Sequence, residues 1–202
     1  MDGGKQTWIS IDGVEAAGKT TLVNVLRERF EDVLVVDEFG DDPVGRFLRE
    51  TVKHHPHVYS ESLVGQSLVF LGEFWQRFDS LIRPALTRGA VVLCDRGYLS
   101  KYVYQFVVMK PSIGEAAAHS LLAAVFQPMP EPTLTVVLSA PIELLRARAF
   151  DRGESWDDEW ETFVKEASSV FASPPLAAGA LLSFDTSQMD PGAIADVVLS
   201  SF

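Results

Sequence analysis

Five short apolar runs alternate with longer segments of helical periodicity along this 202-residue chain. Each run is bounded by polar or turn residues, which is typical of a buried strand. The five runs are residues 8–12, 33–37, 90–95, 134–139 and 180–185. The segments expected to be helical are residues 20–30, 59–86, 99–108, 113–126, 141–150, 157–171 and 191–200, with loops near 52–58, 109–112 and 127–133. The alternation predicts one α/β domain over residues 1–202, a three-layer sandwich in which helices cover both faces of a five-stranded parallel sheet.

Composition narrows the class of protein. The net charge of -11 argues against a nucleic-acid partner, because such proteins usually carry a basic face. No apolar run approaches the roughly 20 residues that a membrane helix needs, so no membrane association is expected. The single cysteine, Cys94, lies in an apolar run and is expected to be a buried core thiol. Together with a first segment that lacks the pattern of a secretory signal or organelle presequence, these features predict a cytoplasmic protein.

A phosphate-binding motif follows the first expected strand. Residues 13–20, GVEAAGKT, match the pattern G-x-x-x-x-G-K-[ST] between a strand and a helix. The glycines let backbone amides turn toward a phosphate, Lys19 would reach the terminal phosphates, and Thr20 would offer a hydroxyl to Mg²⁺. The chain has no N-K-x-D guanine-reading motif, which disfavours a GTPase. The residues expected to bind ATP are Gly13, Ala16, Ala17, Gly18, Lys19, Thr20 and Thr21.

A second motif follows the third expected strand. The stretch VVLCDRGYLSKYVYQ, residues 91–105, resembles the D-R-Y-x-x-S-x-x-x-Y-Q pattern of the thymidylate kinase family. Residues 67–96, 132–148 and 184–198 are also similar to that family, so the resemblance covers nearly the whole chain. It implies a P-loop kinase fold, a homodimer, and transfer of a phosphoryl group from ATP to dTMP or a related nucleotide.

The same resemblance implies roles for individual residues. Thr20 and Asp95 would organise Mg²⁺, Asp95 through water. A lid over residues 146–160 would supply Arg148 and Arg152, which share a helix face at i, i+4, although a solvated basic face is the alternative. The residues that would act in catalysis are Lys19, Asp95, Arg96, Arg148 and Arg152. Those that would bind the acceptor are Glu15, Glu38, Phe70, Phe74, Arg96, Ser100, Tyr104 and Gln105.

The carboxylate of Glu15 is unexpected inside an anion-binding loop. The resemblance implies that it hydrogen-bonds the 3′-hydroxyl of the acceptor sugar, a donor that suits an ionised carboxylate. A solvated loop charge is the alternative.

Three departures from the family pattern concern the acceptor. Phe74 stands where the family has the arginine that reads thymine. This phenylalanine either lines the acceptor pocket or joins a core stripe with Phe70 and Phe78. Arg77 or Gln105 could supply the hydrogen-bond donor that is lost with the arginine. The sequence DEFGDDP, residues 37–43, replaces a stretch that carries a basic group near the acceptor phosphate. Its carboxylates would disfavour a phosphate unless Mg²⁺ or Arg46 intervenes. Gly97 replaces a tyrosine that is also expected on the acceptor side.

These departures leave two alternatives open. Glu38 could act as the general base of a nucleoside or small-alcohol kinase. A module that senses ATP without transferring phosphate is the other.

Two further groups of residues call for simpler interpretations. The histidines of residues 53–60 suggest a polar loop more than a metal site. Trp156 and Trp160 are expected to pack the lid helix.

Overall fold

The sheet has the predicted strands, and all neighbouring strands run parallel. The computed structural model describes residues 6–54, 61–174 and 178–202. Its strands are β1 (Thr7–Gly13), β2 (Val33–Val36), β3 (Val91–Asp95), β4 (Leu134–Ser139) and β5 (Ala180–Asp185). The order across the sheet is β2-β3-β1-β4-β5. Strands β2 and β3 therefore lie on one side of β1, and β4 and β5 lie on the other. The loop after β1 is thus at the topological switch point of the sheet, where ligands bind in folds of this type.

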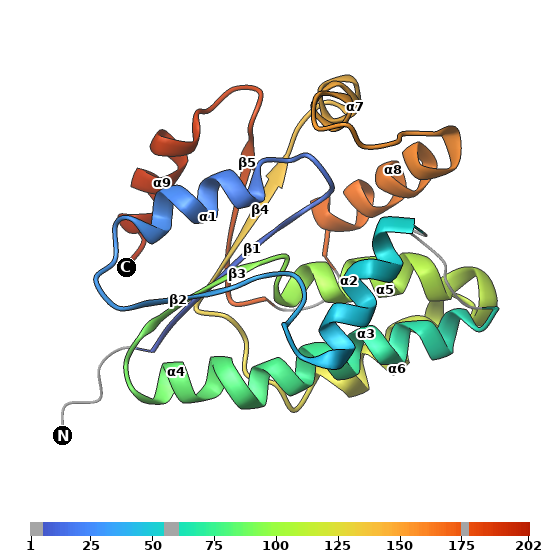
Figure 1. Cartoon of the computed structure of the whole chain (residues 1–202), viewed down its shortest axis with the longest axis horizontal. Helices are drawn as coiled ribbons and strands as arrows, with labels where there is room; N and C mark the ends of the chain where they lie inside the picture. Colours follow the sequence, from blue (N-terminus) through green and yellow to red (C-terminus); the bar gives the residue numbers. More distant parts are fainter. Residues whose placement is uncertain (1–5, 55–60, 175–177) are drawn as a thin grey trace.

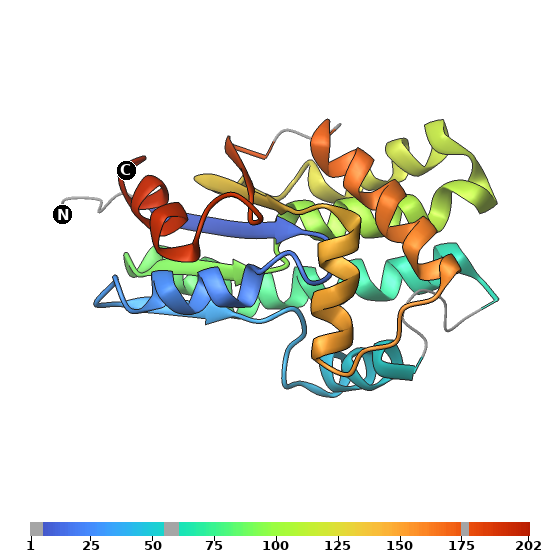
Figure 2. The same ribbon diagram turned by 90° about the horizontal axis from the view of Figure 1, so that it is seen from above.

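Helices cover both faces of the sheet (Figures 1 and 2). On one face lie α1 (Lys19–Arg27) and α9 (Pro191–Leu199), which pack against each other. On the other face lie α3 (Leu63–Arg77), the π-helical turn η1 (Phe78–Ile82), α4 (Arg83–Thr87), α5 (Tyr98–Ile113), α6 (Glu115–Phe126) and α8 (Asp158–Ala172). Two further helices, α2 (Pro43–His54) and α7 (Ile142–Asp151), lie beyond the carboxyl ends of the strands (Figure 2). The predicted three-layer α/β fold is confirmed.

Side chains of both helical layers form the core with the sheet. Trp8 of β1 is 2% exposed and contacts the ring of Phe78, with ring centroids 5.5 Å apart. Its indole Nε1 donates a hydrogen bond to Cys94 Sγ at 3.2 Å. Burial raises the pKa of the Cys94 thiol to about 12, so this group is the inert core thiol that the sequence predicted. Among the described residues, no helix combines the length and the apolar character needed to cross a membrane.

Three predicted boundaries were wrong. Helix α2 was missed, although Asp42 precedes Pro43 and its Oδ1 accepts hydrogen bonds from two backbone N–H groups at the helix start. The loop predicted at 109–112 is helical, because α5 continues through Pro111 to Ile113 and ends before Gly114, whose φ is 83°. A proline near the end of a helix removes only one hydrogen bond of the last turns. The predicted loop at 52–58 is helical to residue 54 and otherwise lies outside the described residues.

Candidate active site

The loop between β1 and α1 has the backbone geometry of an anion cradle. Gly13 has φ of 132°, and a Cβ at this position would lie 2.2 Å from the carbonyl oxygen of Leu138. Gly18 adopts the left-handed conformation at the start of α1, with φ of 95°, and Ala16 also has a positive φ of 59°. Only glycine fits the first of these positions. The loop therefore turns its amides inward and ends at a helix N-terminus, where an anion is favoured.

Lys19 is buried beside this loop. It is 4% exposed, and its Nζ donates to the carbonyl oxygen of Val14 at 2.5 Å. Burial lowers the pKa of Lys19 to about 8, while the carboxylates of Glu15 and Asp95 act in the opposite direction. An anion bound in the loop would compensate this buried cation.

Thr20 and Asp95 come together at the carboxyl ends of β1 and β3. The Thr20 hydroxyl donates to Asp95 Oδ2 at 2.5 Å. Hydroxyl and carboxylate oxygens are hard donors, and Mg²⁺ commonly uses one or two such protein ligands together with water and phosphate oxygens. Among the described residues there is no cluster of three or more histidine, cysteine, aspartate or glutamate side chains suited to a metal. The predicted pair is thus assembled, whereas much of the histidine-rich loop lies outside the described residues.

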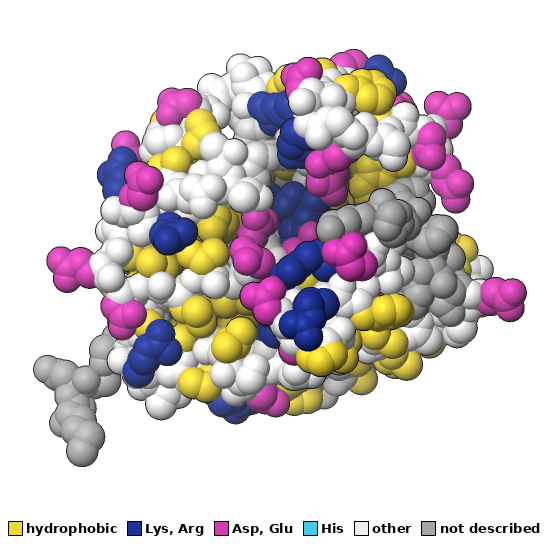
Figure 3. Space-filling view, viewed as in Figure 1, with side chains coloured by type: hydrophobic (Ala, Val, Ile, Leu, Met, Phe, Trp, Pro, Cys, Tyr) yellow, Lys and Arg dark blue, Asp and Glu magenta, His cyan; other side chains and the backbone are white. Residues whose placement is uncertain are grey.

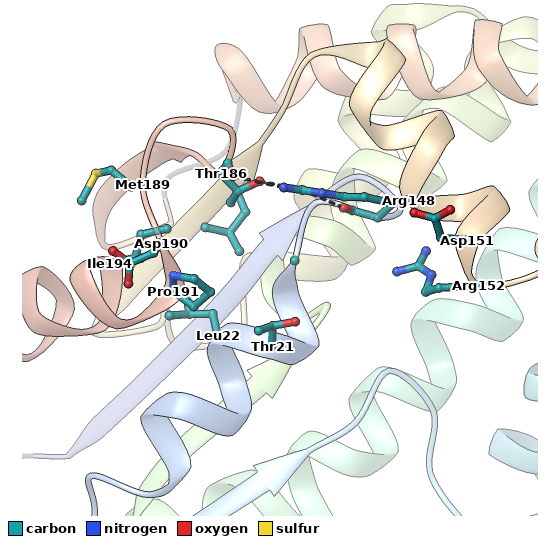
Figure 4. Close-up of a pocket in the computed structure, with 13 residues that line it drawn as sticks. Thr21, Leu22, Arg148, Asp151, Arg152, Thr186, Met189, Asp190, Pro191 and Ile194 are labelled. Carbon is teal, nitrogen blue, oxygen red and sulfur yellow. Dashed lines mark hydrogen bonds between the residues drawn. The ribbon is translucent and has the colours of Figure 1, made fainter.

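One pocket opens beside the loop toward α9, and we call it the α9 pocket (Figure 4). Its walls come from the phosphate loop, α1, α7, β4 and the segment that leads from β5 into α9. The lining residues are Ala16, Gly18, Thr21, Leu22, Leu138, Arg148, Asp151, Arg152, Thr186, Met189, Asp190, Pro191 and Ile194. Arg148 crosses from α7 to the end of β5, where Nη1 donates to Thr186 Oγ1 at 2.9 Å and to the Ala16 carbonyl at 3.2 Å. The pocket combines apolar walls with a planar cation at its edge.

A second pocket lies on the other side of the loop, and we call it the α5 pocket. Its lining residues are Glu15, Glu38, Phe39, Val52, Gln66, Phe70, Arg96, Ser100, Lys101, Tyr104, Gln105, Val108, Trp160 and Phe163. Arg96 and Glu38 therefore share this cavity with five other residues that were predicted to bind the acceptor: Glu15, Phe70, Ser100, Tyr104 and Gln105. In the view of Figure 1, the space-filling picture in Figure 3 shows Lys and Arg side chains together with Asp and Glu side chains in the hollowed centre of the molecule.

Arg96 is the charged centre of the α5 pocket. Its guanidinium contacts Glu15 Oε2 at 2.6 Å, Glu38 Oε2 at 3.0 Å and the Tyr104 hydroxyl at 2.8 Å. Burial alone would lower the pKa of Arg96, but the surrounding carboxylates, Glu15 first, raise it well above its usual value. The backbone of Arg96 has a positive φ of 56°, an uncommon conformation for this residue type. The site thus holds this side chain in place at a cost in backbone energy.

The position of Glu15 explains how a carboxylate fits beside an anion cradle. Burial would raise its pKa, but Arg96, Lys19 and Arg152 together lower it. Arg152 Nη2 lies 3.4 Å from Glu15 Oε1, so the carboxylate is held between two arginines. Glu15 faces the α5 pocket and its negative charge is compensated. These contacts disfavour the alternative of a solvated loop charge.

The carboxylates of the DEFGDDP stretch differ in their surroundings. Asp37 is exposed and does not line it, Asp41 pairs with Arg49 at 3.1 Å, and Asp42 caps α2. Only Glu38 points into the cavity, where Arg96 neutralises it. Asp37 and Asp41 line an adjoining cavity that also includes Glu15, Glu38 and Phe39, so the repulsion of a phosphate by this stretch stays a prediction. Arg46 is exposed and lines neither cavity.

A buried ion pair fixes the backbone of this stretch. Glu73 and Arg77 of α3 lie 2.6 Å apart (Oε1 to Nε), with side chains 0% and 3% exposed. Arg77 donates to the backbone carbonyls of Asp37 and Glu38, and Glu73 accepts from the N–H of Gly40 at 2.8 Å. Arg77 is therefore not a donor to the cavity, contrary to one of the suggested replacements for the missing arginine.

Two positions assigned to the acceptor side do not reach the α5 pocket. Phe74 is 1% exposed and packs on Phe126 in the core, so its assignment to substrate binding is corrected in favour of the core stripe. Gly97 packs inward, where a Cβ would lie 2.3 Å from Ser10 Oγ. The replacement of the family's tyrosine by Gly97 therefore affects packing in the core and leaves the lining of the α5 pocket unchanged.

Other residues of the α5 pocket were missed by sequence reasoning. Lys101 lies one residue beyond the recognised Ser100 and carried no motif signal. Trp160 packs on Phe163 with nearly parallel rings, as expected for a residue of the lid helix, but it also lines the cavity. The i, i+4 spacing of Glu73 and Arg77 was a usable signal for a pair.

The fold and the two pockets define a class of protein, the P-loop kinases that act on nucleotides. The loop of residues 13–20 separates two cavities, and basic side chains approach it from β3 and α7. Residues 11–174 match the family model described as Thymidylate kinase. The chain belongs to this family of ATP-dependent nucleotide kinases.

Relatives and solved structures agree with this assignment. A thymidylate kinase of Pseudomonas fluorescens strain Pf-5 is 33% identical over 177 residues, which are 85% of this chain and 82% of that protein. One from Pseudomonas putida strain W619 is 34% identical over 170 residues, 81% of this chain and 80% of that protein. The thymidylate kinase structure from Candida albicans has a TM-score of 0.74 at 18% identity and covers 96% of this chain and 89% of that one. At this identity the structural likeness establishes the fold alone.

Proposed function

We propose that this protein transfers the γ-phosphoryl group of ATP to dTMP with the help of Mg²⁺. ATP would occupy the α9 pocket and dTMP the α5 pocket. The observation that carries the proposal is that the phosphate loop stands between the two cavities: Ala16 and Gly18 line one, and Glu15 lines the other. Phosphoryl transfer requires donor and acceptor to meet in line, and this arrangement supports such a meeting.

On the ATP side, the loop amides and Lys19 would hold the β- and γ-phosphates. The Thr20 hydroxyl and the Asp95 carboxylate would hold Mg²⁺, and their 2.5 Å contact supports a shared ion. The metal would neutralise charge that develops on the phosphate oxygens. Arg148 would flank the nucleotide from the position it takes beside Thr186.

Two arginines are placed to stabilise the transferring group. Arg152 lines the α9 pocket and also contacts Glu15, which belongs to the α5 pocket, so it spans the junction between the cavities. Arg96 approaches the junction from β3. Cationic donors fixed where charge spreads over phosphoryl oxygens are the main source of rate enhancement in such transfers.

On the acceptor side, Phe70 and Gln105 would bind the base. Phe70 would stack on it, as the resemblance implies. Gln105 is 5% exposed, and its Oε1 has no hydrogen-bond partner in the described part of the chain. A side-chain amide offers one acceptor and two donors, which can pair with the N3–H and O4 edge of thymine. Glu15, Ser100 and Tyr104 would complete the binding of the sugar and phosphate.

The alternative in which Glu38 deprotonates a nucleoside hydroxyl has less support. Its Oε2 is engaged by Arg96 Nε at 3.0 Å, so action as a base would first require this ion pair to break. The ATP-sensing module is disfavoured by membership of a family of kinases.

The test is ATP consumption with mass detection of products, using dTMP, dUMP and thymidine as separate acceptors. A diphosphate product from dTMP is expected. Thymidine monophosphate formed from thymidine, without any diphosphate from dTMP, would transfer the chemistry to Glu38 and refute the proposal. The Gln105→Leu variant should raise KM for dTMP by about 10-fold, because a buried base contact is lost.

The homodimer and the cytoplasmic setting stay predictions. Leu68 and Val69 on α3 are 46% and 39% exposed, which supports a helix surface that could pack against a second copy. Light scattering during size exclusion would report the oligomeric state.

A further inference from the structure

Lys101 lies at the end of the first turn of α5, with its side chain in the α5 pocket. It is 4% exposed, although lysine is almost never fully buried without a partner. Its Nζ donates to the backbone carbonyl of Glu38 at 3.0 Å and lies 4.5 Å from the centroid of the Phe39 ring. No other hydrogen bond or ion pair of this ammonium is found among the described residues.

The charges around Lys101 are already matched to one another. Glu38 and Glu15 both contact Arg96, at 3.0 and 2.6 Å. Glu73 contacts Arg77 at 2.6 Å. Among the described cations that line the α5 pocket, Lys101 therefore has no carboxylate in direct contact, and one of the three donors of its ammonium is used in the hydrogen bond to Glu38.

Burial disfavours the charged form of this group. Desolvation lowers the pKa of Lys101 to about 8, with Arg77 and Arg96 acting in the same direction and Glu38 and Glu73 opposing them. An anionic ligand in contact with Nζ would reverse the shift, because it would replace the lost hydration and supply the missing opposite charge.

We propose that Lys101 binds the 5′-phosphate of the acceptor nucleotide and is the residue that makes the α5 pocket select a monophosphate over a nucleoside. This inference rests on the proposed function, since it assigns the acceptor phosphate to a particular side chain. The same carbonyl of Glu38 accepts hydrogen bonds from Lys101 and from Arg77, so the ammonium is held at a fixed point of the pocket wall. The anion of the acceptor would bind where the chain presents a cation without a carboxylate.

The experiment is calorimetric titration of the full-length protein with dTMP and, separately, with thymidine. The variants are Lys101→Met, which keeps length and removes charge, and Lys101→Arg, which keeps charge. Lys101→Met should weaken dTMP binding by about 10- to 100-fold, the usual loss for a hydrogen bond to a charged group, and change thymidine binding by less than about 2-fold. Lys101→Arg should retain much of the preference for dTMP.

Lys110→Met is the matched control on the same helix. Lys110 pairs with Glu166 and does not line the α5 pocket, so this variant should bind both ligands as the wild type does. Equal loss of dTMP and thymidine affinity in Lys101→Met would show that Lys101 only shapes the pocket and would overturn the inference. A preference for dTMP that persists in Lys101→Met would overturn it while leaving the proposed function intact. A wild type that binds dTMP no more tightly than thymidine would overturn both.

Discussion

Replacement of Glu73 by leucine should strongly destabilise the protein. The Glu73–Arg77 pair is the most deeply buried ion pair between described residues, with a contact of 2.6 Å and side chains 0% and 3% exposed. Loss of Glu73 leaves the Arg77 guanidinium buried without its carboxylate and leaves the N–H of Gly40 without its acceptor. Breaking such a pair costs about 3 to 5 kcal/mol. In a domain of this size each kcal/mol lowers Tm by about 2 to 4 °C, so a decrease of about 6 to 20 °C is expected.

The assay is urea and thermal unfolding of Glu73→Leu, Arg77→Met and the double variant. The double variant should be less destabilised than the sum of the two single variants, because it leaves no unpaired buried charge. Asp79→Asn is the control, since the Asp79–Arg83 pair has the same i, i+4 spacing and a 2.8 Å contact but is 59% and 57% exposed. Exposed pairs of this kind contribute about 0 to 1 kcal/mol.

A Glu73→Leu variant that loses less than about 1 kcal/mol would refute this reasoning. So would simple additivity in the double variant, since it would mean that the two side chains do not act together.

Three further predictions concern the phosphate loop and the core. Gly13→Ala should destabilise the fold by about 1 to 3 kcal/mol and weaken ATP binding, because the added Cβ would lie 2.2 Å from the Leu138 carbonyl oxygen. Gly72→Ala in α3 is the control: a Cβ there would have no heavy atom within 4 Å, so this variant should be more stable by about 0.5 to 1 kcal/mol. The pKa of Lys19 falls to about 8 from 10.5, so between these pH values the unfolded chain retains a proton that the folded state has released. Lysine at this position therefore opposes folding most below pH 8, and the stability advantage of Lys19→Met over the wild type should shrink from pH 7.5 to pH 10 in urea unfolding; a constant difference would contradict the burial argument. Cys94, 1% exposed and with a pKa of about 12, should resist iodoacetamide at pH 8 until urea unfolds the protein, as measured by intact mass.

The sequence was sufficient for features that depend on neighbouring residues. Strands β1, β3 and β4 could be predicted because a strand buried on both faces is a continuous apolar run. Strand β5 also has an apolar run, but it lies at the edge of the sheet and none of its residues is buried, so the expectation of a buried strand there was wrong. The phosphate loop could be predicted because Gly13, Gly18 and Lys19 act through backbone geometry within one short segment. Asp95 is the last residue of β3 and Arg96 follows it directly, so their place at the carboxyl edge of a parallel sheet followed from the order of elements. These residues are local in sequence and local in space.

Tertiary structure decided the partners of charged and aromatic side chains. Glu15 and Arg96 are 81 residues apart, and only the pairing of β1 with β3 brings their side chains to 2.6 Å. Phe74 fits equally well in a pocket or a core stripe until the packing of α3 on α5 and α6 places it against Phe126. Lys101 carries no motif, and its role depends on which carboxylates the neighbouring arginines have already paired with. A periodic pattern can state which residues share a face of a helix, but contacts between distant segments set the dielectric surroundings and the charge balance of each group.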